Sequence, residues 1–423
     1  MVDHFYMGIG NAGSVLSEDQ IRTVIQNSLQ QWSFAGKKIL VILPDHTRTA
    51  PVPLIFRTLV ETLGETCAKL DFLSALGTHP VMSHDSLCKL VGITPEEHAQ
   101  KYDRIGLYCH RWDLAETFIN LGTITAEETR QYSRDMLSLD VPVRVNRMVI
   151  EYDVILVYSP VFPHEVAGFS GGKKYFFPGI SGPEVINFTH WLGALITSFK
   201  TIGVEDTPVR QVINRASGTI PTPVIYLCSA GKTEGLYGIF ISEGDAAWNA
   251  AVKLSSQIHI RYLDHPYRVV FSEMPAMYDD LWTGAKGMYK LEPVVADGGE
   301  VIIFAPRITE ISYTHGKIID EVGYHVRDYF VKQWDRFKGY PWGVLAHSTH
   351  LRGMGTYENG VENARILVSL STGIPAKRCQ KVNLGYRDPA GLKPEEWREK
   401  EVSSVLYVPH AGEVLYRLRD DHI

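Results

Sequence analysis

The sequence comprises 423 residues, of which 45% are hydrophobic and 21% are charged, and its formal net charge is −6. These values are typical of a globular protein that is too long for one ordinary hydrophobic core, so they predict two domains. The weak negative charge and the lack of basic runs argue against nucleic acids and anionic membranes as partners.

Targeting and redox features point to one compartment. No run of about 18 apolar residues predicts a membrane span, and the N-terminus lacks the basic and apolar regions of a signal peptide. The five cysteines are scattered and form no CxxC pair. This pattern excludes a cysteine-rich zinc or iron–sulfur site and fits reduced thiols, so we expect a cytoplasmic protein.

Apolar runs of strand length alternate with helical segments in the first half of the chain. Ser17 and Gln20 predict a capping box at the start of the first helix. The expected strands are 37–43, 70–76, 104–109 and 153–159, with 143–150 as a further candidate, and the expected helices are 52–65, 83–92 and 94–102. This alternation predicts an α/β fold with mostly parallel sheets.

The same pattern restarts after a predicted helix at 245–258. The expected elements there are strands at 267–273, 300–306, 342–348 and 364–371 and a helix at 326–337. We therefore place one α/β domain at 1–260 and a second α/β domain at 261–405. Residues 406–423 are a candidate return segment to the first domain.

Three loops that follow predicted strands carry unusual polar residues. They are DHTR (45–48), GTHP (77–80) and PHEVAGFSGGKKYFFPGISG (163–182). Ligands of doubly wound sheets bind outside the carboxyl ends of the strands, so we expect these loops to converge. His79 and His164 are then a candidate acid/base pair, and the fork of Arg48 suits a carboxylate or phosphate.

The glycine-rich loop fits neither of two common site classes. A P-loop has G-x-x-x-x-G-K-[ST], but Ala167 stands five residues before Gly172 and Lys174 replaces the hydroxyl residue. A zinc-binding HExxH motif fails because Gly168 follows His164 at the position of the second histidine. A solvated glycine-rich turn remains an alternative to a ligand site. His190, about two turns into a predicted helix, is open between packing and metal ligation.

Together these motifs resemble the nickel-dependent lactate racemase family, whose enzymes carry a nickel-pincer nucleotide. The shared motifs are PDHTRTAP, GTHP, HEVAGFSGGKK followed by PG, and THW, and the resemblance covers most of the chain. Its most specific part is the H-x₃-GFSGG-x-K spacing, with a histidine sixteen residues beyond the second lysine.

The resemblance implies a covalently bound cofactor, nickel pyridinium-3,5-bisthiocarboxylic acid mononucleotide. Lys174 would form the thioamide tether, and His190 would bind the nickel ion. The further cofactor contacts would be Asp45, Ser170, Gly171 and Gly172. Protein made without the cofactor-synthesis proteins, which are its implied partners, is expected to lack the cofactor.

The implied reaction is inversion at C2 of a small 2-hydroxyacid. One histidine of the pair His79 and His164 removes the hydroxyl proton while hydride passes from C2 to the cofactor, and hydride returns to the opposite face. Arg48 and Lys286 would contact the substrate carboxylate. The resemblance also implies that the domain at 1–260 binds the cofactor, that the domain at 261–405 closes over the substrate, and that the active site lies in the cleft between them.

Two departures from the family pattern leave the acid open among lactate, malate, aromatic and sugar acids. Thr283, preceded by Trp282, stands where the lactate enzymes carry a glutamine three residues before the second-domain lysine. Pro80 directly follows His79, where a basic residue often follows the histidine in the family. Both of these positions should line the substrate pocket. A loop expected after the strand 342–348 adds further polar groups that would suit a longer, hydroxylated or dicarboxylic acid. These groups are His347, His350 and Arg352.

Two other classes of function remain open. One is a hydrolase or lyase that uses an ordinary divalent metal held by His79, His164 and His190. The other is a non-catalytic protein that binds or stores the nickel nucleotide.

Overall fold

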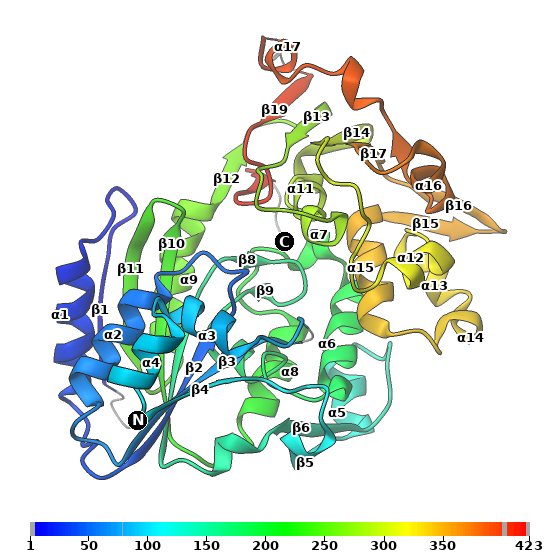
Figure 1. Cartoon of the computed structure of the whole chain (residues 1–423). Coiled ribbons are helices and arrows are strands. Elements are labelled where there is room, and N and C mark those ends of the chain that lie inside the picture. Colours follow the sequence, from blue (N-terminus) through cyan, green and yellow to red (C-terminus); the bar gives the residue numbers. More distant parts are fainter. Residues whose placement is uncertain (1–4, 78, 400–403, 420–423) are drawn as a thin grey trace. The chain divides into compact units, whose positions relative to one another are not determined.

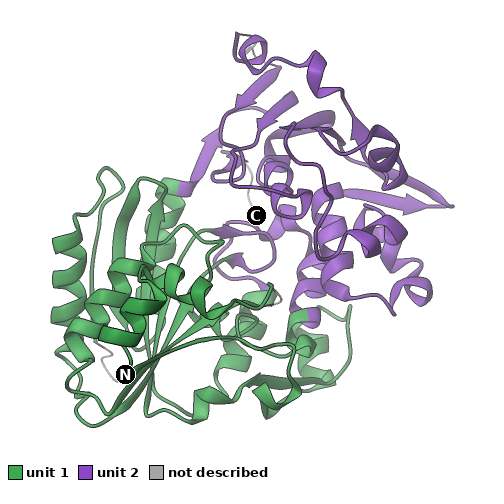
Figure 2. Cartoon of the chain, in the orientation of Figure 1, with its two compact units in different colours: residues 1–162, 169–186, 208–258 green, residues 163–168, 187–207, 259–423 purple. Residues whose placement is uncertain are grey.

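The computed structural model describes residues 5–77, 79–399 and 404–419. The chain divides into two compact units, which Figure 2 shows in different colours. The first unit comprises 1–162, 169–186 and 208–258, and the second comprises 163–168, 187–207 and 259–423. Among the described residues, no helix is both long enough and apolar enough to cross a membrane.

The first unit is built on a seven-stranded sheet (Figure 1). In spatial order its strands are β1 (Tyr6–Gly10), β11 (Gly235–Ser242), β10 (Val224–Lys232), β7 (Val154–Pro160), β2 (Lys38–Pro44), β3 (Lys69–Ala75) and β4 (Ile105–Cys109). The pairs from β10 to β4 are parallel, and the β1–β11 and β11–β10 pairs are antiparallel.

Burial on both faces explains why the central strands appear as continuous apolar runs in the sequence. On β2, Ile39 and Val41 belong to the core under α1 and α2, and the alternating Leu40 and Ile42 are equally buried. Parallel sheets are covered on both sides in this way. The predicted strands 37–43, 70–76, 104–109 and 153–159 are confirmed.

The second unit has a five-stranded sheet in which all neighbouring pairs are parallel. In spatial order its strands are β18 (Gly385–Tyr386), β17 (Leu367–Thr372), β14 (Val295–Ala305), β13 (Tyr267–Glu273) and β19 (Val405–Val408). The predicted α/β fold with two mostly parallel sheets is therefore confirmed.

Four two-stranded sheets complete the strand inventory. They are β5 (Phe118–Ile124) with β6 (Val141–Asn146), β8 (Pro163–His164) with β9 (Gly168–Phe169), β12 (Ile260–Leu263) with β20 (Leu415–Leu418), and β15 (Gly355–Glu358) with β16 (Val361–Ala364).

The α-helices of the first 260 residues are α1 (Glu18–Leu29), α2 (Val52–Leu63), α3 (His84–Val91), α4 (Pro95–Lys101), α5 (Ala126–Tyr132), α6 (Pro183–Ile196), α7 (Ser198–Thr201), α8 (Pro208–Ser217) and α9 (Ala246–His259). Those that follow are α10 (Leu281–Gly284), α11 (Lys286–Tyr289), α12 (Gly316–Val322), α13 (Arg327–Val331), α14 (Trp334–Phe337), α15 (Trp342–Arg352), α16 (Ala376–Lys381) and α17 (Pro394–Glu399). The capping box predicted for the first helix is present, because Ser17 and Gln20 each accept the other's backbone N–H.

Three predicted elements differ from the structure. The expected strand 342–348 is part of the helix α15, and the expected helix 326–337 is divided into α13 and α14. The candidate strand 143–150 ends at Asn146 and continues as a short 3₁₀ helix, η2 (Arg147–Ile150).

The candidate return segment belongs to the second unit and not to the first. Its strand β19 pairs with β13, and β20 pairs with β12, so backbone hydrogen bonds hold both strands within that unit. The first unit ends at residue 258, close to the expected boundary at 260. It is interrupted by 163–168 and 187–207, which the sequence did not indicate.

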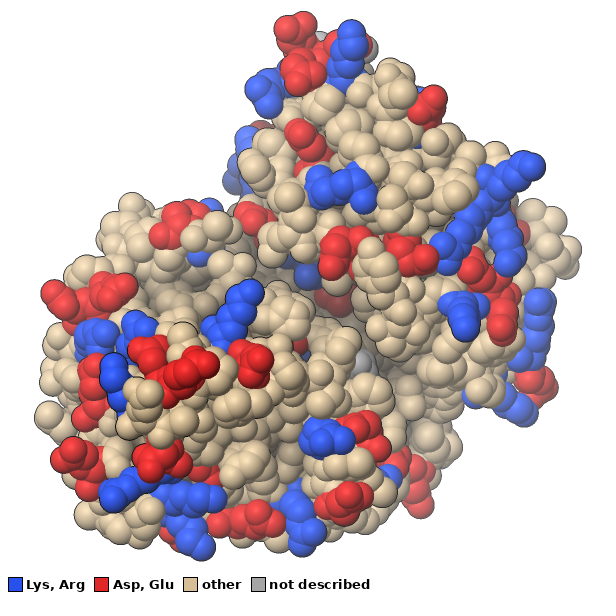
Figure 3. Space-filling view, viewed as in Figure 1, with Lys and Arg blue, Asp and Glu red and all other residues tan. Residues whose placement is uncertain are grey.

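Acidic and basic side chains are interspersed on the face seen in Figure 3. The near balance of 42 basic and 48 acidic residues in the sequence implies such a mixed surface.

Candidate active site

The strand order of the first sheet reverses between β2 and β7. From β2 the chain continues through β3 and β4 on one side, and β7 and β10 lie on the other side. Ligands bind outside the carboxyl ends of the strands at such a reversal. Because β2 ends at Pro44 and β7 at Pro160, the segments that begin with Asp45 and Val161 start at this place.

Asp45 connects the loop after β2 with the loop after β3. Its buried carboxylate accepts hydrogen bonds from the backbone N–H (3.1 Å) and hydroxyl (2.6 Å) of Thr47, and from Nδ1 of His79. Burial raises the pKa of Asp45, but the hydrogen bond from His79 and the charge of Arg48 outweigh this effect and hold the pKa well below its ordinary value. Since Nδ1 of His79 donates to a carboxylate, Nε2 of the neutral ring carries no proton and can accept one.

Two helices fix the turn at Ser170–Gly172 by donating to its backbone carbonyls. Arg210 of α8 donates to the carbonyl just before Ser170 and to that of Gly171 (3.4 Å), and Trp248 of α9 donates to that of Ser170 (2.9 Å). The φ angles of Gly171 and Gly172 are +81° and +57°, a region that favours glycine. A Cβ atom at Gly171 would also lie only 2.6 Å from a neighbouring valine.

Serine hydroxyls hold the same turn against the end of β7. The Ser170 hydroxyl donates to the Pro160 carbonyl (2.8 Å) and accepts the N–H of Phe162 (3.0 Å). The N–H of Gly172 donates to the Ser159 hydroxyl (2.9 Å). The turn is therefore a rigid part of the sheet edge and not a solvated surface loop.

The two lysines that follow have different surroundings. Lys173 forms an ion pair with Asp245 at 2.8 Å. Lys174 is half-buried in the 3₁₀ helix η3 (Gly172–Tyr175). Burial raises the pKa of Tyr175 and the charge of Arg48 opposes this rise, so η3 lies close to the loop after β2. Asp245 thus gives Lys173 a structural role.

His164 lies in the second unit and presents the opposite tautomer to His79. Its Nδ1 accepts the backbone N–H groups of Val166 (3.1 Å) and Ala167 (3.4 Å), so the neutral ring carries its proton on Nε2. The Glu165 carboxylate lies 3.5 Å from the same Nδ1. Thus Nε2 of His79 is an acceptor, whereas Nε2 of neutral His164 is a donor.

Glu165 is the centre of a charged cluster in the second unit. Burial raises its pKa, but electrostatic interactions with His164, His350 and Lys286 and a backbone hydrogen bond outweigh burial and hold the pKa below its usual value. Burial is the main cause that lowers the pKa of His350 to about 4; Glu165 opposes this shift and the neighbouring His190 adds to it. His350 is therefore neutral at pH 7, and Lys286 is the permanent cation.

Helix α15 places two buried histidines one turn apart, where a loop was expected. The ring of His347 stacks on Trp282 with centroids 3.8 Å apart, and its Nε2 donates to the Trp282 carbonyl (3.0 Å). Among the described residues, Nδ1 of His347 and both ring nitrogens of His350 have no hydrogen-bond partner. Because buried polar groups are nearly always paired, these nitrogens are candidate substrate contacts. Arg352 instead forms an ion pair with Glu362 at 3.5 Å.

The second sheet has its own reversal, between β13 and β19. Tyr278 follows β13 and Gly412 follows β19, and both lie against Lys286, whose Nζ is 5.1 Å from the Tyr278 ring centroid. Nearby, the hydroxyl and N–H of Thr283 donate to the Asp280 carboxylate at 2.8 and 2.9 Å. Lys286 therefore occupies the ligand-binding edge of this sheet, and the Thr283 hydroxyl is used to begin α10.

The residues singled out from the sequence form two sets. The first unit contains Asp45, Arg48, His79, Ser170, Gly171, Gly172 and Lys174, and the second contains His164, His190, Trp282, Thr283 and Lys286. Asp45 brings Arg48 and His79 together in the first set. In the second set, Glu165 and His350 connect His164, His190 and Lys286.

Comparison with known proteins identifies the family. The family model "Lactate racemase N-terminal domain" matches residues 16–202. A lactate racemase from Thermoanaerobacterium thermosaccharolyticum is 22% identical over 312 residues, which cover 68% of this chain and 65% of the relative. Residues 16–202 belong to the lactate racemase N-terminal domain family. The resemblance seen in the sequence motifs is thereby confirmed.

A second curated lactate racemase is similar over a comparable length. The lactate racemase of Lactiplantibacillus plantarum is 22% identical over 284 residues, 66% of this chain and 62% of the relative. The chain thus spans slightly less than two thirds of the length of these curated relatives.

Two solved structures share the fold. A crystal structure of a protein from Thermotoga maritima has a TM-score of 0.86 at 31% identity and covers 97% of this chain and 100% of its own. The lactate racemase apoprotein from T. thermosaccharolyticum has a TM-score of 0.74 at 18% identity and covers 96% and 94%.

Sequence reasoning did not predict the positions of two residues of the candidate site. Glu165 directly follows His164, and this acidic neighbour was the available signal. The sequence pattern predicts a loop at His350, because α15 lacks the polar face that marks a surface helix.

Proposed function

We propose that this member of the lactate racemase family inverts C2 of a 2-hydroxyacid with a nickel-pincer nucleotide bound to Lys174. The observation that carries this proposal is at the β2–β7 reversal, where the Asp45–His79 pair lies near the helix η3 that bears Lys174. A general base and a covalent anchor at one ligand-binding edge suit a tethered cofactor that acts on a proton-releasing substrate.

The residues of this chain fit the nucleotide. The rigid turn Ser170–Gly172 lets the backbone approach a ligand closely. The spacing H-x₃-GFSGG-x-K makes Lys174 the lysine for the thioamide, and Lys173 is bound to Asp245. His190 is half-buried beside the His350 ring and would be the protein ligand to nickel. When bound, the nickel nucleotide supplies the acceptor and donor for the hydride of the substrate's C2 carbon.

The chain's own residues manage the proton and the carboxylate. Nε2 of His79 is oriented as a base by Asp45, and Nε2–H of His164 is oriented to donate to the substrate oxygen. The two histidines exchange roles when the opposite enantiomer reacts. Arg48 and Lys286, one at the reversal point of each sheet, are the proposed carboxylate contacts.

We infer that the substrate is an acid other than lactate. Where lactate enzymes have glutamine, the Thr283 hydroxyl is bound to Asp280, and the adjacent Trp282 is stacked on His347. The neutral rings of His347 and His350 keep ring nitrogens without partners among the described residues. These nitrogens suit a substrate with an additional hydroxyl or carboxylate group.

The deciding experiment uses protein co-expressed with the proteins that synthesise the nucleotide. Intact mass should show a covalent adduct in the wild type and in Lys173→Ala, but not in Lys174→Ala. Each protein is then incubated with D- or L-lactate, malate, phenyllactate and sugar acids, and C2 inversion is followed by chiral chromatography.

Each outcome separates the alternatives. Inversion that is lost in Lys174→Ala and kept in Lys173→Ala supports the proposal. Unchanged activity in Lys174→Ala would overturn it in favour of an ordinary divalent-metal enzyme. An adduct without inversion of any acid would favour a protein that stores the nucleotide.

A further inference from the structure

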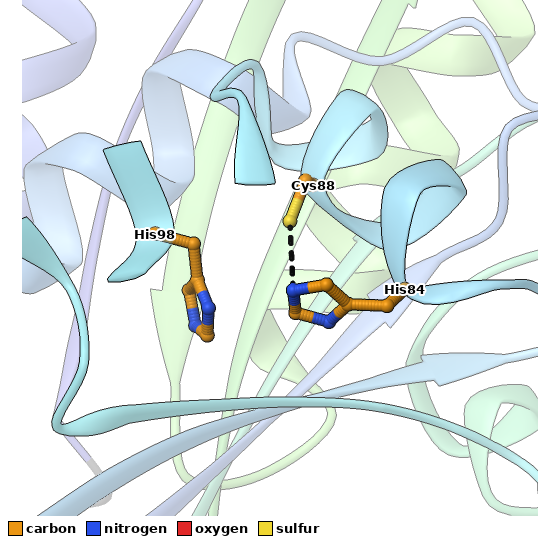
Figure 4. Close-up of side chains that lie close together, drawn as sticks. All are labelled: His84, Cys88 and His98. Atoms are coloured by element: carbon orange, nitrogen blue, oxygen red, sulfur yellow. Dashed lines mark hydrogen bonds between the residues drawn. The ribbon is translucent and has the colours of Figure 1, made fainter. Parts of the chain in front are cut away.

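A cluster of metal-ligating side chains lies on α3 and α4, outside the active site described above. The ligand atoms of His84, Cys88 and His98 all lie within 4.8 Å of one another. Figure 4 shows that His84 and Cys88 come from one helix and His98 from the next. Nothing in the proposed reaction uses these three residues. We propose that they form a binding site for a zinc-class divalent ion that fastens α3 to α4.

Helix geometry sets the first two ligands. His84 and Cys88 are four residues apart on α3, so their side chains lie on the same face. The His84 Nε2 atom lies 3.5 Å from the Cys88 Sγ atom. With zinc bond lengths of about 2.05 Å to nitrogen and 2.3 Å to sulfur, a tetrahedral site separates these two atoms by roughly 3.6 Å. The pair is therefore already spaced as two ligands of one ion.

The third ligand, His98, is oriented by a hydrogen bond to a backbone carbonyl. Nε2 of His98 donates to the Ile105 carbonyl at 2.8 Å, which leaves Nδ1 with its lone pair. Metal-binding histidines commonly donate their other ring N–H to a backbone carbonyl in this way. The ligand atoms are within 4.8 Å, so closing them onto one ion requires shifts of about 1 Å.

The charge and the backbone around the cluster also favour a cation. The carboxylates of Asp85 and Glu96 lie near the Cys88 sulfur and bring two negative charges to the cluster. Only three residues, from Gly92 to Thr94, connect α3 to α4, and a capping box starts α4.

The ligand set indicates the kind of ion and its coordination. One sulfur and two imidazole nitrogens are typical of zinc and unlike the oxygen ligands of magnesium or calcium. His84 is exposed, so water or one of the two carboxylates completes the tetrahedron. On binding, the ion takes the place of the Cys88 thiol proton, which passes to solvent.

The test uses the full chain without an affinity tag and without the nickel nucleotide, stripped of metal by a chelator. Co²⁺ is titrated while the thiolate-to-cobalt charge-transfer absorbance is recorded, and Zn²⁺ is then added to displace it. We expect one Co²⁺ per chain with a thiolate band. Cys88→Ser should abolish this band, and His84→Ala should weaken Co²⁺ binding at least about tenfold.

Matched variants keep the result interpretable. Cys109→Ser removes a half-buried cysteine outside the cluster, and His265→Ala removes an exposed histidine. Both should bind Co²⁺ like the wild type. Because His84 is exposed, His84→Ala should fold even if Cys88→Ser does not. Zn²⁺ should raise the thermal midpoint of the wild type but not of His84→Ala.

Two results would overturn the proposal. One is a wild-type titration without a thiolate band, and the other is wild-type affinity in His84→Ala. The contacts would then be a thiol–imidazole hydrogen bond and an edge-to-face ring pair, with ring centroids 5.0 Å apart.

Discussion

The buried ring of His350 can be tested as a single residue because its two possible roles have opposite effects on stability. Neither of its nitrogens has a partner among the described residues, so a leucine there removes an unsatisfied polar group. Such a change leaves the free energy of unfolding nearly unchanged or raises it. We expect His350→Leu to keep wild-type stability at pH 7 and to raise KM for the substrate found in the acid panel, with a smaller effect on kcat.

The pH dependence of stability sharpens this prediction. Burial lowers the pKa of His350 to about 4, below the value of about 6.5 expected in the unfolded chain. The unfolded state therefore binds the proton more tightly, and the wild type loses stability as the pH falls below about 6.5. By pH 5 this loss is about 2 kcal/mol, and His350→Leu should avoid it. Urea unfolding at pH 7 and pH 5 measures both quantities.

His325→Leu is the matched control in the same unit. Its Nδ1 lies 2.6 Å from the Glu362 carboxylate, so this substitution breaks a charge-assisted hydrogen bond and should cost about 1–3 kcal/mol at pH 7. If His350→Leu proves equally destabilising and KM is unchanged, His350 is a structural residue and the substrate contact is excluded.

At the scale of elements, the turn Ser170–Gly172 depends on the helices packed beside it. Arg210→Ala on α8 removes the guanidinium donor to the carbonyl just before Ser170 and one of two donors to the Gly171 carbonyl. It also removes the stacking of the guanidinium over Trp248, which it faces at 4.3 Å. We expect a loss of about 2–4 kcal/mol in the free energy of unfolding and less adduct at Lys174 in co-expressed protein.

The same helix supplies the control. Arg215 of α8 forms a half-exposed ion pair with Glu128 at 2.6 Å. Arg215→Ala should cost less than about 1 kcal/mol and leave adduct formation unchanged. Urea unfolding and intact mass give the two measurements. Full adduct formation in Arg210→Ala would mean that the turn does not position Lys174.

The elements that could be predicted are those whose pattern has one physical cause. The strands β2, β3, β4 and β7 are buried on both faces, and their apolar runs are bounded by polar loops. Helix α15 could not be predicted because its residues from Val344 to Leu351 are all buried, which removes the polar face that marks a surface helix. Short apolar runs are compatible with strand or helix. Because of this ambiguity, the sequence pattern predicts a loop at His347 and His350.

The residues of the candidate site also divide into those that local motifs predict and those that only tertiary packing brings together. Asp45, His79, His164 and Lys174 could be proposed from the sequence because they lie in local motifs after strands. The cluster around Glu165 could not, because its members are brought together by tertiary packing from distant segments. Likewise, the ion pair of Lys173 joins η3 to Asp245, more than 70 residues away in sequence.

At the scale of the whole molecule, neither unit is a continuous stretch of chain. Residues 187–207 lie in the second unit although they precede 208–258, which lie in the first. In the second unit, Trp191 is only 1% exposed and stacks on Trp334 with centroids 5.0 Å apart. Arg417 donates to the Ile202 carbonyl at 2.7 Å. A boundary near residue 260, as the sequence suggested, would cut through this core.

We therefore expect residues 259–423 expressed alone to lack cooperative unfolding. Loss of a buried tryptophan alone costs about 3–5 kcal/mol, a large part of the 5–15 kcal/mol that stabilises a typical domain. A chimera that joins 187–207 to 259–423 through a flexible linker should recover a cooperative urea transition, followed by circular dichroism. The same chimera with Trp191→Ala should lose most of that gain. Equal, cooperative transitions for 259–423 and for the chimera would show that α6 is dispensable and that the second unit folds from its C-terminal stretch alone.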